Sequence, residues 1–146
     1  MSWRALLAAR RVSRHRTSRE EIASLRAVVE RDLRDAAVPG LSDDRRFATA
    51  YEAALQLARM AIACSGYRVK GHGAHATTFE ALRLSLGPEV RDLAAYLDAC
   101  RRKRNLLEYD AAHVVTSSEA DELVTQAGRF RDRVERWIAE HRPDLS

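Results

Sequence analysis

The stretch CRRKRNLLEYD, from Cys100 to Asp110, closes the longest continuous helical pattern in the chain. The pattern begins after Gly87, where Pro88 suits a first helical turn because proline lacks the amide hydrogen that this turn leaves unbonded. At about 100° per residue, the apolar positions fall within an arc of roughly 140°. These positions are Val90, Leu93, Ala94, Leu97, Cys100 and Leu107. The pattern predicts an amphipathic helix packed against other helices.

Three charged residues, Arg101, Arg104 and Glu108, fall inside the same apolar arc. Burying an unpaired charge costs several kcal/mol. These side chains must therefore be paired, or must face a cleft or a second chain. Breaks of this kind in a local pattern often mark functional sites.

Two helices are predicted before this one, with clear start signals. Thr17 or Ser18 begins the first, since each has a glutamate three residues further on, and Pro39-Gly40 ends it. Ser42 caps the second, an alanine-rich helix that stops near Ser65-Gly66.

Two further helices complete the pattern. Thr77 or Thr78 caps a short one that ends at Gly87, and Ser117 or Ser118 caps the last. No run of alternating β-branched residues is long enough for a strand. The prediction is an all-α fold, an up-down antiparallel bundle of about five helices over residues 18–142. Residues 1–17 form a basic segment, expected to be frayed or loosely docked, with an arm that contacts phosphates or a partner protein as the alternative.

Composition limits the function classes more weakly. A net charge of +4 permits a polyanionic partner without requiring one, because 21 acids are spread among the bases. Cys64 and Cys100 both fall in helical patterns and are expected to be buried small hydrophobes in a reducing cytoplasm. No apolar run approaches the roughly 18 residues of a membrane span, so no membrane partner is expected.

The main loop, GYRVKGHGAHATT, contains His72 and His75. Two histidines without a nearby cysteine or acid are a weak metal signal, and the loop lacks the phosphate-binding Walker pattern. No catalytic triad can be argued from residue spacing. We therefore expect neither a metal nor a cofactor.

One group of polar residues stands above this background: Arg101, Arg104, Asn105, Glu108 and Tyr109. Arginine can bind phosphate with two parallel hydrogen bonds, and Asn105 offers both a donor and an acceptor. A purely structural explanation is also open, because Arg104 and Glu108 are four residues apart and can pair on the helix.

The sequence resembles the HEPN superfamily of prokaryotic α-helical domains. Three segments carry the resemblance, in the order expected: FATAYEAALQLARMAIACSGYR (47–68), KGHGAHATTFEAL (70–82) and RRKRNLLEYD (101–110). The resemblance implies a helical bundle that forms homodimers. It also implies a neighbouring nucleotidyltransferase as toxin–antitoxin partner, and, in active members, metal-independent endoribonuclease activity.

Active HEPN members carry an arginine, often followed by a polar residue, and then a histidine. By this resemblance Arg104 is the motif arginine and Asn105 the polar residue, but Tyr109 stands at the histidine position. His113 lies too far along the chain to replace it.

Three functions follow from the resemblance and the residues. The first is a component of a toxin–antitoxin or nucleotidyltransferase-linked pair that binds RNA or nucleotide at an arginine-rich dimer cleft through Arg101, Arg104, Asn105 and Glu108. The second is an active ribonuclease that uses Arg104 and Tyr109. The third is a non-catalytic dimeric interaction module in which the charged cluster is a salt-bridge network.

Overall fold

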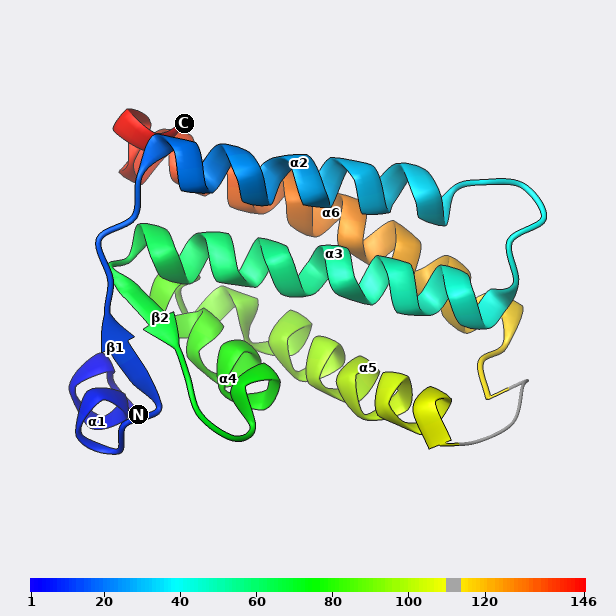
Figure 1. The fold of residues 1–146 in the computed structure, drawn as a ribbon, viewed down its shortest axis with the longest axis horizontal. Coiled ribbons are helices and arrows are strands. Elements are labelled where there is room, and N and C mark those ends of the chain that lie inside the picture. The colour runs from blue at the N-terminus through cyan, green and yellow to red at the C-terminus, as the bar shows by residue number, and fades with distance from the viewer. Residues whose placement is uncertain (110–113) are drawn as a thin grey trace.

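The computed structural model describes residues 1–109 and 114–146. Within them the chain forms six α-helices, two short strands and two 3-10 turns (Figure 1). The elements are α1 (Trp3–Ala8), β1 (Val12–Arg14), α2 (Arg19–Ala36), α3 (Asp43–Cys64), β2 (Tyr67–Val69), α4 (Ala74–Leu86), η1 (Pro88–Val90), α5 (Arg91–Tyr109), α6 (Ser117–His141) and η2 (Pro143–Leu145). The predicted all-α bundle is confirmed.

Helix α3 is the centre of the bundle. It packs against α2 and α6, and also against α4 and α5. Figure 1 shows α2 and α5 running in one direction and α3 and α6 in the other, which is the predicted up-down arrangement. Thirteen of the 22 residues of α3 are buried, and six of these are alanines. Alanine side chains let neighbouring helices approach closely, so α3 can be covered on most sides.

The first two helix starts were predicted correctly. The Ser18 hydroxyl accepts a hydrogen bond from the Glu21 amide at the start of α2, and the Ser42 hydroxyl accepts one from the Arg45 amide at the start of α3. Each bond satisfies an amide that a helix start leaves without an intrahelical partner.

The starts of the last helix and of α4 were predicted wrongly. The cap of α6 is Thr116, in a capping box with Glu119, rather than Ser117 or Ser118. Helix α4 begins at Ala74, behind the left-handed Gly73, whose φ is 71°. Thr77 and Thr78 are therefore buried inside α4 and cap nothing.

The N-terminal segment is docked, and the expectation of a frayed or loosely docked segment is wrong. Strand β1 pairs antiparallel with β2, with Val12 opposite Val69. The Trp3 ring stacks on Tyr67 with the ring centroids 4.2 Å apart. Leu6 and Val12 are buried. The expectation of no strand is also wrong, since strands of three residues are too short to show an alternating pattern.

Cys64 and Cys100 are free and buried, as predicted. Burial raises the pKa of each thiol to about 11, so both stay protonated at neutral pH. In residues 1–109 and 114–146 no helix combines the length and apolar character needed to cross a membrane.

Candidate functional site

The candidate site lies on the second half of α5. The buried residues that anchor this helix in the bundle lie before it. Of the 19 residues of α5, only Leu97 and Cys100 are buried. After Cys100 no residue of the helix is fully buried, but Leu107 still packs against the core, and Lys103 forms an ion pair with Glu119 of α6. This ion pair, together with Thr116, lowers the pKa of Glu119 to about 2. The last two turns of α5 are therefore held in place, with Arg104 and Leu107 on the side of the bundle and Asn105, Glu108 and Tyr109 exposed.

Arg104 points back toward the bundle. Its guanidinium pairs with Glu108 on the same helix and lies 4.0 Å from Glu52 on α3. Its side chain is only 25% exposed. It lines a cavity of about 220 Å³ between α2, α3 and α5, whose other polar lining residues are Arg31, Asp32, Thr49, Glu52 and Gln56.

Arg101 is held in a similar way. Its guanidinium donates to Asp98 over 2.8 Å, and its side chain is 22% exposed. Both arginines that interrupt the apolar pattern are thus paired with acids at the edge of the bundle. Pairing with an acid is one of the alternatives that the sequence allows for these charges.

The remaining predicted site residues face solvent. Asn105 and Glu108 are exposed, and Tyr109 is 84% exposed at the end of α5. The structure therefore brings Arg101 and Arg104 to one side of α5 and leaves Asn105 and Tyr109 outside the cavity. Asp110 and His113 lie outside the described residues.

A histidine that the sequence analysis did not connect with these arginines lies next to them. His75, in the first turn of α4, accepts or donates a hydrogen bond with the Tyr51 hydroxyl of α3 over 3.3 Å. Arg59, Arg101 and Arg104 are close enough to affect the charge of His75. The same three arginines also act on Tyr51. Tyr51 and His75 are thus in contact, and the charges of Arg59, Arg101 and Arg104 act on this pair.

The electrostatics of this cluster fix the protonation of its two central groups. Burial, with a further contribution from Arg59, lowers the pKa of His75, so the imidazole is neutral at pH 7. Burial also raises the pKa of Tyr51, which keeps its proton. The Tyr51 hydroxyl can then donate to Nδ1 of His75, which leaves the imidazole proton on Nε2.

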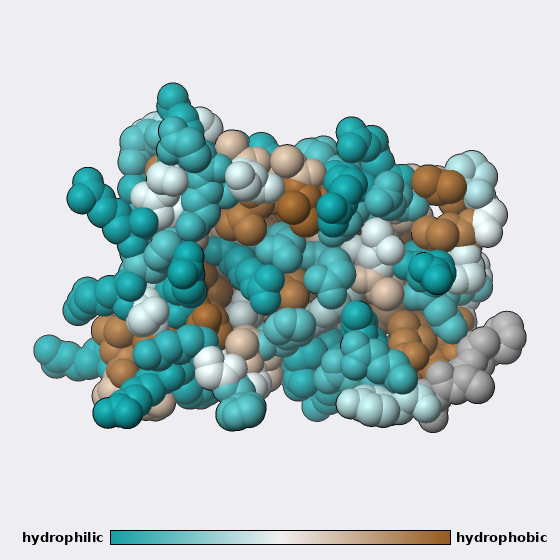
Figure 2. Space-filling view, in the orientation of Figure 1, coloured by the Kyte–Doolittle hydropathy of each residue, from teal (hydrophilic) through white to brown (hydrophobic). Residues whose placement is uncertain are grey.

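This arrangement suits an anionic ligand. The arginines supply the donors that phosphate prefers, and the neutral imidazole can accept a proton. Figure 2 shows hydrophilic residues on this face of the molecule, with apolar patches between them. In the described part of the chain no three His, Cys, Asp or Glu side chains are placed to hold a metal ion.

The sequence indicates His75 only in part. The loop KGHGAHATTFEAL is one of the three segments behind the HEPN resemblance, but within the sequence His75 is no more than a weak candidate metal ligand. Its contact with Tyr51 joins residues 24 positions apart on different helices, and no helical or strand period predicts such a contact.

An antiparallel helical bundle with arginines at the end of its fourth long helix is the class of protein that the fold and site define. The SAV_6107-like HEPN family model matches residues 37–135, and the chain belongs to this family. The match lies inside the predicted bundle and leaves α1, β1 and α2 outside it. No curated protein and no solved structure matches the chain.

Proposed function

We propose that this HEPN-domain protein binds RNA or nucleotide phosphates on the side of α5 that carries Arg101 and Arg104. One observation carries the proposal: Arg101 and Arg104 lie on one side of α5 with side chains only 22% and 25% exposed, and Arg104 lines a cavity between α2, α3 and α5. Arg101 and Arg104 already pair with acids, which hold their guanidinium groups in place. A guanidinium has five N–H donors, so each arginine can keep its acidic partner and bind a phosphate with the donors that remain.

Asn105, Glu108 and Tyr109 would act at the mouth of this site. Asn105 can donate to a phosphate or accept from a base edge. Glu108 orients Arg104 through their ion pair. Tyr109 offers an exposed ring, and stacking of a base on such a ring is worth about 1–3 kcal/mol.

The proposal includes a homodimer, with the cleft completed by the second copy. Leu106 is 49% exposed and Tyr109 84% exposed on the last turns of α5. Large apolar groups are seldom exposed together without a partner. The HEPN resemblance further suggests that the protein is one component of a toxin–antitoxin or nucleotidyltransferase-linked pair.

A second candidate function is metal-independent endoribonuclease activity. The neutral His75 favours it, because this imidazole could take the proton of a ribose 2′-hydroxyl while Arg104 stabilises the charge on the attacked phosphate. In this form of the candidate His75, rather than Tyr109, is the base. Tyr109 would then hold the substrate.

RNA binding tests the main proposal. A labelled single-stranded RNA is titrated with the protein in EDTA, and binding is followed by fluorescence anisotropy at several salt concentrations. Arg104→Ala should weaken binding about tenfold and reduce the salt dependence of the affinity by about one phosphate contact. Arg129→Ala on α6 removes the same charge from an exposed position and is the matched control. Equal binding by both variants and the wild type would mean that the arginine cluster is a structural salt-bridge network.

Cleavage of the same RNA distinguishes ribonuclease activity, the second candidate function, from binding alone. If the protein is a ribonuclease, His75→Ala should abolish cleavage in EDTA and Tyr109→Phe should retain most of it. Absence of cleavage at high protein concentration would reject the ribonuclease function and leave the binding proposal standing.

A further inference from the structure

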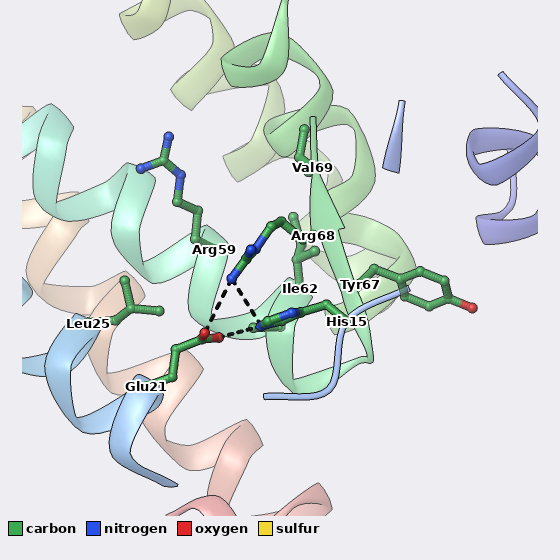
Figure 3. Close-up of a pocket in the computed structure, with 9 residues that line it drawn as sticks. His15, Glu21, Leu25, Arg59, Ile62, Tyr67, Arg68 and Val69 are labelled. Atoms are coloured by element: carbon green, nitrogen blue, oxygen red, sulfur yellow. Dashed lines mark hydrogen bonds and ion pairs between the residues drawn. The ribbon is translucent and has the colours of Figure 1, made fainter. Parts of the chain in front are cut away.

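The groove between α2 and α3 holds a second and larger cavity, at the end opposite to Arg104. Its volume is about 350 Å³, within the roughly 300–1,000 Å³ range of small-molecule sites. It is lined by residues from β2, α2, α3 and the segment that joins β1 to α2 (Figure 3). None of the residues at this end was singled out as a site from the sequence.

One wall of this cavity is a preorganised polar network around Glu21. His15 Nε2 lies 2.7 Å from one oxygen of Glu21, and the Thr17 hydroxyl donates to the same oxygen over 2.8 Å. Arg68 donates to the other oxygen over 3.4 Å. Figure 3 shows His15 and Arg68 converging on Glu21. The carboxylate is thus held on three sides, and Arg68 is held at the cavity wall.

Arg59 lines the other wall of the cavity, and its guanidinium is directed toward Gln56 and away from Glu21 (Figure 3). Within the described residues it forms no ion pair, and its one hydrogen bond is a 3.4 Å contact with Gln56. Its side chain is half-buried, and Figure 3 shows its guanidinium apart from the Glu21 network. A partly buried guanidinium loses some of its hydration, and here no carboxylate offsets that loss. An anionic ligand would offset it, so such a guanidinium is suited to anion binding.

The charges of the cavity favour an anion. Two arginines and one carboxylate line the cavity, and that carboxylate already accepts bonds from three side chains. Burial opposes ionisation of Glu21, but the bonds from His15 and Thr17 outweigh it and lower the pKa of Glu21. Glu21 therefore stays ionised at neutral pH and can accept a further hydrogen bond from a hydroxyl.

The floor of the cavity is apolar. Leu25, Ile62 and Val69 line it, from α2, α3 and β2. Such a surface packs against the carbon face of a ring and excludes water from the charged contacts. An inorganic ion would leave this floor uncovered.

We propose that this cavity binds a small phosphate monoester with a hydroxyl-bearing ring, such as a sugar phosphate or a nucleotide. Arg68 would hold the phosphate together with Arg59, whose guanidinium would turn from Gln56 into the cavity. Glu21 would accept a ring hydroxyl, and the ring would cover Leu25, Ile62 and Val69. The site does not include Arg104 and does not rest on the proposed function, although the charge of Arg59 also acts on His75.

Calorimetric titration of the full chain tests this inference with four probes: AMP, ribose 5-phosphate, adenosine and an RNA hexamer without terminal phosphates. At least one of the two monoesters should bind, and adenosine should bind at least tenfold more weakly than AMP if AMP is bound. Binding of both monoesters identifies the sugar phosphate as the recognised part, whereas binding of AMP alone identifies the base as part of it.

Variants locate the site. Arg59→Gln and Arg68→Gln should each weaken monoester binding at least tenfold, because each removes a charge-assisted contact. Arg129→Gln, which removes the same charge from an exposed position on α6, should bind like the wild type. The Arg68 side chain is 61% exposed, so its replacement should leave the thermal unfolding temperature unchanged.

Two results would overturn the inference. The first is that neither monoester binds, including the case in which only the RNA hexamer does. The second is that the Arg59→Gln and Arg68→Gln variants bind the monoesters as tightly as Arg129→Gln. Failure of the proposed function would instead be read from RNA binding by Arg104→Ala.

Discussion

Helices α3 and α5 have similar lengths and opposite roles. Thirteen of the 22 residues of α3 are buried, whereas two of the 19 residues of α5 are. Helix α3 is covered by four other helices, whereas α5 has no fully buried residue after Cys100. The difference suggests that α3 carries the stability of the bundle and that the end of α5 is free to carry charge for a ligand.

The largest expected effect on stability comes from a substitution in the buried helix α3. Leu57 is fully buried, and Leu57→Ala should lower the free energy of unfolding by about 2–5 kcal/mol, because it removes buried apolar area and leaves a cavity. Leu106→Ala on α5, where the side chain is 49% exposed, should cost less than about 0.5 kcal/mol. Chemical denaturation measures both, and similar losses would contradict the division of roles.

A smaller effect is expected at the start of α3. Ser42→Ala removes the hydroxyl that accepts from the Arg45 amide and should cost about 1 kcal/mol. Ser24→Ala, at an exposed position inside α2, is the matched control and should be neutral or slightly stabilising. If the two variants are equally stable, the cap contributes nothing to α3.

The pair that joins α3 to α4 should make stability depend on pH. The pKa of His75 is lowered from its ordinary value of 6.5, so the unfolded chain binds this proton more readily than the folded one. The contribution of His75 is therefore complete above pH 6.5 and is lost as the pH falls below that value. The pKa values of Glu21 and Asp144 are also lowered. Their contributions to the free energy of unfolding are lost only in a more acidic range, below their ordinary pKa values of 4.5 and 3.8.

Replacement of His75 isolates this contribution. Between pH 7 and pH 5 the free energy of unfolding of His75→Gln should fall less than that of the wild type, as measured by denaturation at each pH. Parallel curves for the two proteins over this range would show that His75 is not desolvated next to Tyr51.

The smallest effect is expected at the end of α5. Glu108→Gln breaks the ion pair with Arg104, but the Glu108 side chain is 53% exposed, and exposed pairs contribute about 0–1 kcal/mol. The unfolding free energy should change by less than about 0.5 kcal/mol. A loss well above 1 kcal/mol would show that the charges on α5 serve the fold, as in a non-catalytic interaction module.

Local signals predicted more of the fold than of the site. Ser18 and Ser42 could be found because capping depends on residues three positions apart. Strands β1 and β2 could not, since each has three residues and is stabilised by pairing between distant segments. The cap of α6 was missed by one residue because Thr116, Ser117 and Ser118 are all suitable types.

The candidate site shows the same limit. Arg101 and Arg104 were found because they interrupt a helical period, and their acidic partners Asp98 and Glu108 lie within four residues. His75 and Tyr51 interrupt no period, and only the folding of α4 onto α3 brings them beside the arginines. Tyr109 matched a motif position in the resemblance, but its 84% exposure depends on how the end of α5 lies against the bundle.

The central claim is that the charged end of α5 binds phosphate, and RNA affinity as a function of salt tests it most directly. The account predicts that Arg104→Ala weakens binding about tenfold and flattens the salt dependence, whereas Arg129→Ala has the smaller effect of a distant charge. Equal affinities and equal salt slopes for the two variants would contradict it.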